Sequence, residues 1–169
     1  SSLSGGEKQR LTLFLVLYLK PKVMFFDELT TGLDYEKRQK ILKMIYNYSV
    51  NKTVFTVTHY FDELQNWANK LLILYKGEVI FWGSLQQLKE LYPHYGILKI
   101  KDTIETNDFI VIPDVDCNTN ILIVKNKAEQ TKAMNYLNKK NISFELLPCN
   151  IYSLYTLLIY DNTKEVKNA

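Results

Sequence analysis

The feature that most constrains this sequence is a short, uninterrupted apolar run that ends in two carboxylates. Residues 23–26 are all apolar, and Asp27 and Glu28 follow directly. Runs without alternating polar residues are typical of parallel strands covered on both faces. A second run, 53–58, is rich in β-branched residues and ends directly before His59. The sequence therefore predicts two strands with polar side chains at their carboxyl ends.

Helical patterns flank these strands. Ser4 and Glu7 have the spacing of a capping box, so a helix is expected to begin after Ser4 and to end before Pro21. Its second half is apolar on nearly every face, which predicts burial all round. Further helices are expected over 35–48 and near 62–69. The alternation of strands and helices favours an α/β domain with parallel strands.

The chain, at 169 residues, is long enough for one domain and a small second one. A hairpin at 71–75 and 78–82 and a capped helix to about Leu91 close the first domain, and 93–96 is the clearest linker. Beyond it, strands and a helix follow in the order βββαβα: 97–101, 109–112, 121–124, 128–139, 142–147 and 151–160. We therefore expect an α/β domain over 1–92 and a small α+β domain over 93–169.

Charge, cysteines and hydropathy narrow the class of protein. The net charge of +3 is scattered along the chain, without the basic patch typical of nucleic-acid binding. Cys117 and Cys149 form no CxxC pattern, which favours a reduced pair in a cytosolic protein over a disulfide. The longest apolar runs, 11–19 and 151–160, are about half the length that spans a bilayer. If the protein works at a membrane, another chain must cross it.

Three places along the chain have residues suited to phosphate chemistry. At a helix start, Ser4, Gly5 and Gly6 could bring a hydroxyl and backbone N–H groups to a phosphate, although an ordinary capped helix explains them too. Asp27 could hold Mg²⁺ and Glu28 could accept a proton from water, although an acidic pair can also open a solvent loop.

The third place is His59, which could hydrogen-bond a phosphate or be structural. Asp34 by itself fits a turn or helix-cap acid.

Taken in order, these residues resemble the ATP-binding-cassette (ABC) ATPase family. Leu3-Ser4-Gly5-Gly6-Glu7 and Gln9 match its signature motif, 23–28 its Walker B strand, 31–34 its D-loop and His59 its switch histidine. Residues 58–63 and 72–79 resemble the end of a transporter ATPase domain, so the resemblance covers about 1–92. It departs at Leu29, where the family usually has Pro, and at Phe14 and Leu15, where it usually has small residues.

The resemblance implies ATP and Mg²⁺ as cofactors and a role for each residue. In this family ATP lies between two cassettes arranged head to tail. The implied roles are catalysis for Glu28 and His59, magnesium binding for Asp27, and ATP binding for Ser4, Gly5, Gly6, Glu7, Gln9 and Asp34. The first turn of the signature helix would serve the nucleotide of a partner cassette, while Asp27, Glu28 and His59 would serve the chain's own.

No G-x-x-x-x-G-K-[ST] loop occurs in the sequence, although the family needs one before the signature motif. We therefore expect that Ser1 is not the natural start and that residues 1–169 alone do not hydrolyse ATP.

The resemblance implies the ATPase subunit of a bacterial exporter of drugs, peptides or polysaccharides. Such a subunit is cytoplasmic, on the inner face of the cell membrane, and pairs with a second ATPase subunit and with separate permease chains, not with nucleic acid. The alternatives are a soluble ABC ATPase acting on nucleic acid or ribosomes, and an inactive dimerisation fragment. Many such bacterial subunits have a similar small C-terminal appendix. In it, 151–158 could contact a partner or pack on its own sheet.

Overall fold

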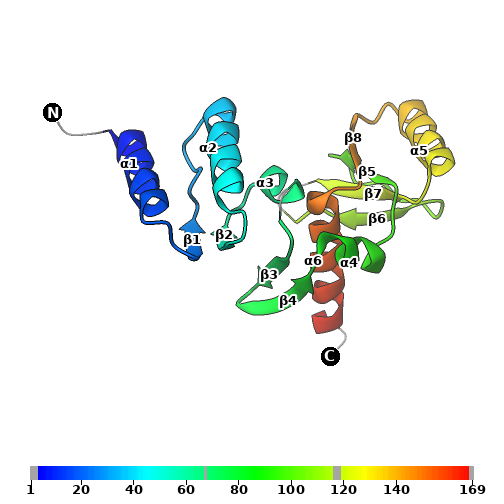
Figure 1. The fold of residues 1–169 in the computed structure, drawn as a ribbon. Coiled ribbons are helices and arrows are strands. Elements are labelled where there is room, and N and C mark those ends of the chain that lie inside the picture. Colours follow the sequence, from blue (N-terminus) through cyan, green and yellow to red (C-terminus); the bar gives the residue numbers. More distant parts are fainter. Residues whose placement is uncertain (1–3, 67, 116–118, 168–169) are drawn as a thin grey trace. The chain divides into compact units, whose positions relative to one another are not determined.

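A computed structural model describes residues 4–66, 68–115 and 119–167 of the chain (Figure 1). Leu3 and Cys117, which the sequence analysis names, lie outside these residues. The chain forms two compact units, Ser1–Glu63 and Leu64–Ala169, and each has its own sheet and helices. Within the described ranges, no helix is both long enough and apolar enough to cross a bilayer.

The first unit alternates helices with strands, as its sequence pattern predicts. Its elements are α1 (Gly5–Tyr18), β1 (Val23–Asp27), α2 (Tyr35–Tyr48), β2 (Thr53–Val57) and the start of α3 (Phe61–Gln65). The strands β1 and β2 pair in parallel, in a register that runs without interruption from Val23–Thr53 to Asp27–Val57. The predicted parallel strands are therefore confirmed, and their carboxyl ends meet at one edge of the sheet.

One face of this sheet packs on the two long helices. Met24 and Phe26 of β1 are buried against Leu13 of α1 and Ile45 of α2. The alternate residues of β1 point the other way, so that the exposed ring of Phe25 stacks on Phe55 of β2 at 4.8 Å between ring centroids. Period-two alternation thus gives a sheet with one covered and one open face within the described part of this unit.

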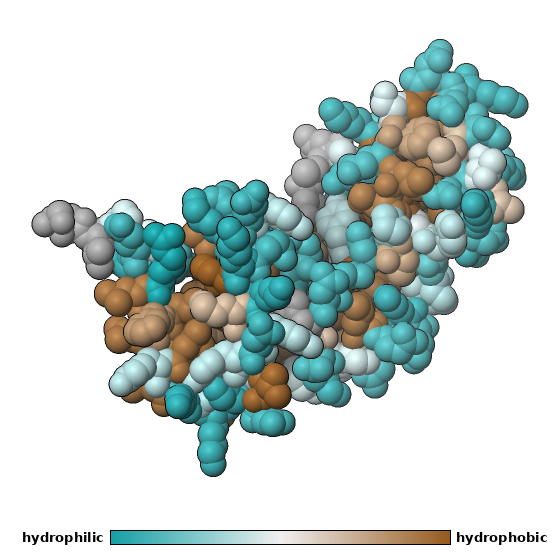
Figure 2. All heavy atoms as spheres, turned by 45° about the horizontal axis from the view of Figure 1, so that its top comes forward, coloured by the Kyte–Doolittle hydropathy of each residue, from teal (hydrophilic) through white to brown (hydrophobic). Residues whose placement is uncertain are grey.

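The prediction that α1 is buried all round is wrong for this structure. Leu13 is its buried residue, whereas Phe14 and Tyr18 are 62% and 73% exposed. The helix packs on the core with one side only, because the described residues of the first unit form a single layer against it. Figure 2 shows the resulting hydrophobic surface around α1, at the left of the view.

The second unit joins a hairpin to an antiparallel sheet. Its elements are β3 (Leu71–Tyr75), β4 (Glu78–Gly83), α4 (Leu85–Leu91), β5 (Gly96–Ile100), β6 (Ile110–Pro113), β7 (Asn120–Val124), α5 (Lys127–Lys139), β8 (Phe144–Pro148) and α6 (Ile151–Lys167). Lys76 and Gly77 connect β3 to β4 with positive φ angles of 50° and 87°, as a tight hairpin turn requires. By compactness this hairpin groups with the antiparallel sheet, and the domain division near residue 93 stays a prediction.

The four-stranded sheet, in the order β6-β7-β5-β8, has a helix on each face. Leu98 and Leu122 pack with Leu137 of α5, while Ile97 and Ile121 pack with Leu157 of α6. Alternate residues of the central strands therefore enter two separate cores, which explains why β5 and β7 are apolar almost throughout. The sheet packs tightly at Gly96, where a Cβ atom would lie 2.7 Å from the carbonyl oxygen of Leu147.

Candidate functional site

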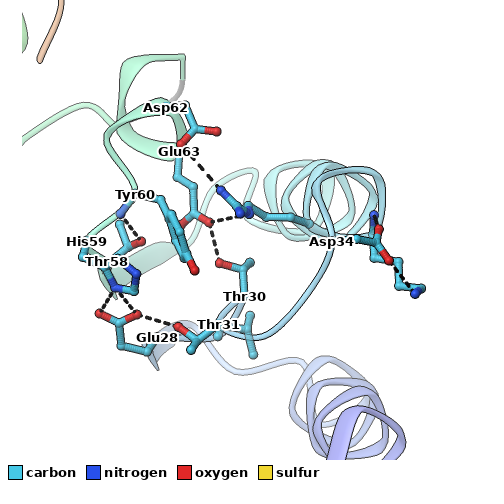
Figure 3. Close-up of polar contacts among 12 residues, drawn as sticks. Glu28, Thr30, Thr31, Asp34, Thr58, His59, Tyr60, Asp62 and Glu63 are labelled. Atoms are coloured by element: carbon cyan, nitrogen blue, oxygen red, sulfur yellow. Dashed lines mark hydrogen bonds and ion pairs between the residues drawn. The ribbon is translucent and has the colours of Figure 1, made fainter. Parts of the chain in front are cut away.

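Glu28 and His59 lie side by side at the carboxyl edge of the parallel sheet. Glu28 directly follows β1, and its N–H donates to the carbonyl oxygen of Val57 in β2 at 2.9 Å. His59 follows β2 after Thr58, so the side chains of Glu28 and His59 leave the sheet at the same level. The Nδ1 atom of His59 lies 2.7 Å from Oε2 and 2.9 Å from Oε1 of Glu28 (Figure 3).

The surroundings of Glu28 keep its carboxylate charged. The hydrogen bond from His59 lowers the pKa of Glu28 most, and a 2.7 Å bond from the Thr31 hydroxyl lowers it further. The backbone of Glu28 has a φ of 50°, in the left-handed region that residues other than glycine adopt uncommonly. The N–H of Thr31 closes this turn on the Glu28 carbonyl at 3.0 Å. An ionised base on a strained turn is an arrangement often found at functional sites.

Asp27 is the last residue of β1, and its exposed carboxylate sits at the same edge as Glu28. A carboxylate oxygen is the donor that hard cations such as Mg²⁺ prefer, and Mg²⁺ usually takes one or two protein carboxylates and several waters. The described residues hold no cluster of three or more His, Cys, Asp or Glu side chains that could bind a metal by themselves. The exposed carboxylate of Asp27 could supply one such ligand.

The first turn of α1 forms a second group of predicted site residues. The N–H and the hydroxyl of Ser4 both donate to Oε2 of Glu7 at 2.8 Å, and these bonds lower the pKa of Glu7. Gly5 and Gly6 begin the helix, and a Cβ atom added to either would meet no described atom within 4 Å. The N-terminal end of α1 thus combines free approach with the favourable field of a helix start.

Gln9 and Asp34 have local partners. The Gln9 amide donates to the carbonyl oxygen of Leu29, which ties α1 to the loop directly after Glu28. Asp34 caps α2: its Oδ1 accepts the N–H of Lys37 at 2.9 Å and its Oδ2 pairs with the Lys37 ammonium at 2.5 Å. These bonds from Lys37 lower the pKa of Asp34. The helix-cap reading of Asp34 is therefore confirmed, and its role in ATP binding stays a prediction.

The structure thus brings Glu28, His59 and, through Leu29, Gln9 together, and it leaves the first turns of α1 and α2 as separate groups. Sequence reasoning missed a cluster behind His59, formed by the buried Thr30 and Glu63 and the partly buried Arg38 and Tyr60. The sequence offered one signal: Arg38 stands one helical turn after Asp34, and Glu63 stands one helical turn after His59. Neither spacing by itself says that the two would meet.

Comparisons with known proteins find relatives among transporter ATP-binding proteins. No protein-family model matches the chain. The methionine import ATP-binding protein MetN of Campylobacter jejuni is 32% identical over 147 residues, which is 86% of this chain and 42% of that protein. The leukotoxin export ATP-binding protein LtxB of Aggregatibacter actinomycetemcomitans is 33% identical over 104 residues, 59% of this chain and 15% of that protein.

A third relative is the energy-coupling factor transporter ATP-binding protein EcfA of Malacoplasma penetrans. It is 37% identical over 90 residues, which cover 52% of this chain and 31% of that protein. The chain therefore spans less than half the length of each of these curated relatives, which include an import protein and an export protein by name.

Proposed function

The chain belongs to the ABC family of transporter ATPases, and from this premise we propose that it serves ATP hydrolysis in a longer protein. The observation that carries the proposal is the contact between Glu28 and His59 beside Asp27. A carboxylate, an imidazole and a second carboxylate at one sheet edge suit the attack of water on a phosphate.

In this proposal each residue of the edge has one task. Glu28 accepts the proton of the attacking water, and it is charged for that task because His59 and Thr31 lower its pKa. His59 holds the carboxylate in place through Nδ1, and in its charged form it can also donate the Nε2–H to the phosphate. Asp27 holds Mg²⁺, which, when bound with ATP, neutralises charge on the phosphate oxygens.

The first turn of α1 is proposed as the half-site for a partner's nucleotide. Gly5 and Gly6 offer backbone N–H groups at an open helix start, and the Ser4 hydroxyl can turn from Glu7 to a phosphate oxygen. The bond from Ser4 to Glu7 holds this turn in shape. Asp34 and Gln9 complete the proposed ATP-binding residues, and the partner is a second copy of the same subunit.

Export is the direction of transport that we propose, with drugs, peptides or polysaccharides as the substrate classes. The support is the order of strands and helices from β5 to α6, after residue 92, which resembles the C-terminal appendix of bacterial exporter ATPases. The subunit would bind separate permease chains and lie in the cytoplasm, on the inner face of the cell membrane. Residues 1–169 alone are proposed to be inactive, because they contain no phosphate-binding G-x-x-x-x-G-K-[ST] loop.

Two measurements test this proposal. A full-length gene product that carries this sequence should show Mg²⁺-dependent release of phosphate from ATP, whereas purified residues 1–169 should stay at background. Tagged full-length protein should co-purify with an integral membrane protein from detergent-solubilised membranes. Phosphate release by residues 1–169 would contradict the proposal that these residues alone are inactive. A full-length protein without ATPase activity would contradict the proposed function itself.

A further inference from the structure

Arg38 of α2 contacts the segment that carries His59 at three points. Its guanidinium carbon lies 3.8 Å from the ring centroid of Tyr60. Its Nη1 lies 3.7 Å from Oδ1 of Asp62, and its Nε lies 3.9 Å from Oε1 of Glu63. The side chain is only 15% exposed. One arginine therefore joins the first half of α2 to the loop and short helix that follow His59.

Tyr60 extends this contact to the imidazole. The ring centroids of Tyr60 and His59 lie 4.0 Å apart, and the N–H of Tyr60 donates to Oγ1 of Thr58 at 3.1 Å. Figure 3 shows the Tyr60 ring directly beside His59, on the side away from the carboxylate of Glu28. The imidazole is therefore backed by the Tyr60 ring while its Nδ1 faces Glu28.

Glu63 fastens the same segment from the other direction. Its side chain is 3% exposed, and it accepts a hydrogen bond from the hydroxyl of Thr30, which is 2% exposed. Thr30 stands two positions after Glu28, on the loop that carries the proposed base. A buried carboxylate is costly unless hydrogen bonds and an opposite charge compensate it. Thr30 and Arg38 supply both, so they connect the Glu28 loop with the His59 segment.

The ion pairs of Arg38 are long compared with its contact to the aromatic ring. Hydrogen-bonded pairs of charged groups lie about 2.7–2.9 Å apart, whereas those of Arg38 measure 3.7 and 3.9 Å. Its Nε is buried and has no hydrogen-bond partner among the described residues. The planar guanidinium is therefore held chiefly by the face of Tyr60. A lysine in place of Arg38, or an aliphatic side chain in place of Tyr60, reproduces this contact poorly.

We propose that Arg38, Tyr60 and Glu63 form a positioning relay that holds the His59 imidazole against Glu28 and couples it to the first turn of α2. Asp34 caps this helix one turn before Arg38, so a displacement of the cap carries the guanidinium with it. The Tyr60 ring moves with the guanidinium because the two are in contact, and the His59 imidazole moves with the ring for the same reason. The effect of the relay on turnover rests on the proposed function, whereas its effect on the contact between His59 and Glu28 does not.

The relay is tested first in residues 1–169 by the ¹⁵N chemical shifts of the His59 imidazole, measured by NMR at one fixed pH. These shifts report whether Nδ1 carries the proton that it donates to Glu28. Tyr60→Leu keeps apolar volume but removes the aromatic face, so the proton should leave Nδ1 for Nε2 in part of the molecules, as in Glu28→Ala. Tyr60→Phe should restore the wild-type shifts. Arg38→Lys, which keeps the charge without the planar group, should change them in part. Circular dichroism of each variant verifies that the helices remain.

The matched control is Lys52→Ala. Lys52 lies over the ring of Tyr48 at 3.1 Å in the same unit, so this variant removes a similar contact away from the sheet edge. It should leave the ¹⁵N shifts of the His59 imidazole unchanged. Unchanged shifts in folded Tyr60→Leu would overturn the relay, and so would shifts that do not respond to Glu28→Ala.

The second arm measures turnover in the full-length protein. Tyr60→Leu should lower kcat about tenfold with KM for ATP changed less than about twofold, because the lost interaction positions a reacting group and binds no substrate. Tyr60→Phe should recover most of kcat, and an unchanged kcat in folded Tyr60→Leu would overturn the coupling. If the wild-type protein hydrolyses no ATP, the proposed function fails, while the ¹⁵N shifts of His59 still decide on the relay.

Discussion

The Nδ1 atom of His59 lies 2.7 Å from the Oε2 atom of Glu28, although the two residues are far apart in the sequence. This contact follows from the pairing of two short parallel strands that end at the same level. It also fixes the imidazole tautomer, because Nδ1 must carry the proton when it donates to a carboxylate. Nε2 is then an acceptor in the neutral ring and a donor in the charged one.

Glu28→Gln tests the proposed base in the full-length protein. The amide has the shape of the carboxylate but accepts no proton, so hydrolysis should fall by about 10²–10⁴-fold, the usual contribution of a general base. ATP binding should persist and can be followed by filter retention of labelled nucleotide. Hydrolysis at the wild-type rate in this variant would remove Glu28 from the role of base.

Thr31→Val should shift the pH dependence of the same reaction. Thr31 donates the second of the side-chain hydrogen bonds that lower the pKa of Glu28, and valine has the same shape without the donor. A base works when ionised, so activity is lost as pH falls through its pKa. Because the variant raises that pKa, the acid limb of the kcat/KM profile should move to higher pH. A limb at the wild-type position would mean that Glu28 does not set it.

Asp114→Asn should destabilise the second unit. The Asp114 side chain is fully buried and accepts hydrogen bonds from the Lys99 ammonium at 2.7 Å and the Tyr152 hydroxyl at 2.7 and 2.8 Å. Removal of its charge takes the ion-pair partner from Lys99, whose ammonium keeps only the 2.9 Å hydrogen bond to the Tyr152 hydroxyl. This loss should lower the free energy of unfolding by about 3 kcal/mol. Thr119→Val, the matched control, removes a single 2.8 Å hydrogen bond to the same carboxylate and should cost about 1 kcal/mol.

The effect of Asp114→Asn should also depend on pH. Burial by itself raises the pKa of Asp114, but bonds from Lys99, Tyr152 and Thr119 outweigh it, so the pKa of Asp114 is lowered overall. A lowered carboxylate pKa stabilises the fold above the ordinary value of about 3.9 and loses that contribution as pH falls further. Urea unfolding should therefore show a constant difference between wild type and variant near neutrality, and a shrinking one below about pH 4. A difference that persists at pH 2 would contradict the charge as its source.

His94→Gln should flatten the pH dependence of stability on the acid side of neutrality. The Nδ1 of His94 lies 2.8 Å from the Tyr92 carbonyl oxygen and its Nε2 lies 2.8 Å from the Ser153 hydroxyl of α6. Burial lowers the pKa of His94, although the Tyr92 bond offsets this in part. The unfolded chain then binds the proton better, so stability should fall as pH drops below about 6.5, by at most about 1.4 kcal/mol per pH unit. If the free energy of unfolding of His94→Gln falls with pH as steeply as that of the wild type, the loss of stability comes from other groups.

Much of the first unit was predictable because its strands are short apolar runs. The run before Asp27 and the run before His59 predict β1 and β2 to within a residue of their ends. Parallel strands share a carboxyl edge, so a meeting of Glu28 and His59 follows once the strands are neighbours. Hydropathy does not say which strands are neighbours, and that part needed the structure.

Other features could not be predicted from residue patterns. Apolar periodicity in α1 shows which side chains avoid water, but not which layer covers them, and burial all round was therefore a wrong expectation. The helix predicted over 62–69 ends earlier, at Gln65. The contact between Arg38 and Tyr60 depends on how α2 lies over the loop after β2. Such contacts between separate elements leave no periodic trace in a single sequence.

Because β1 and β2 pair without interruption, natural variants should keep the length of these two strands more strictly than the identity of their residues. Each strand has five residues and pairs with its neighbour from end to end. A one-residue insertion or deletion in either strand would exchange its two faces and displace its end by about 3.3 Å. Gaps in an alignment should therefore be absent from both strands and gather in the turns beyond them.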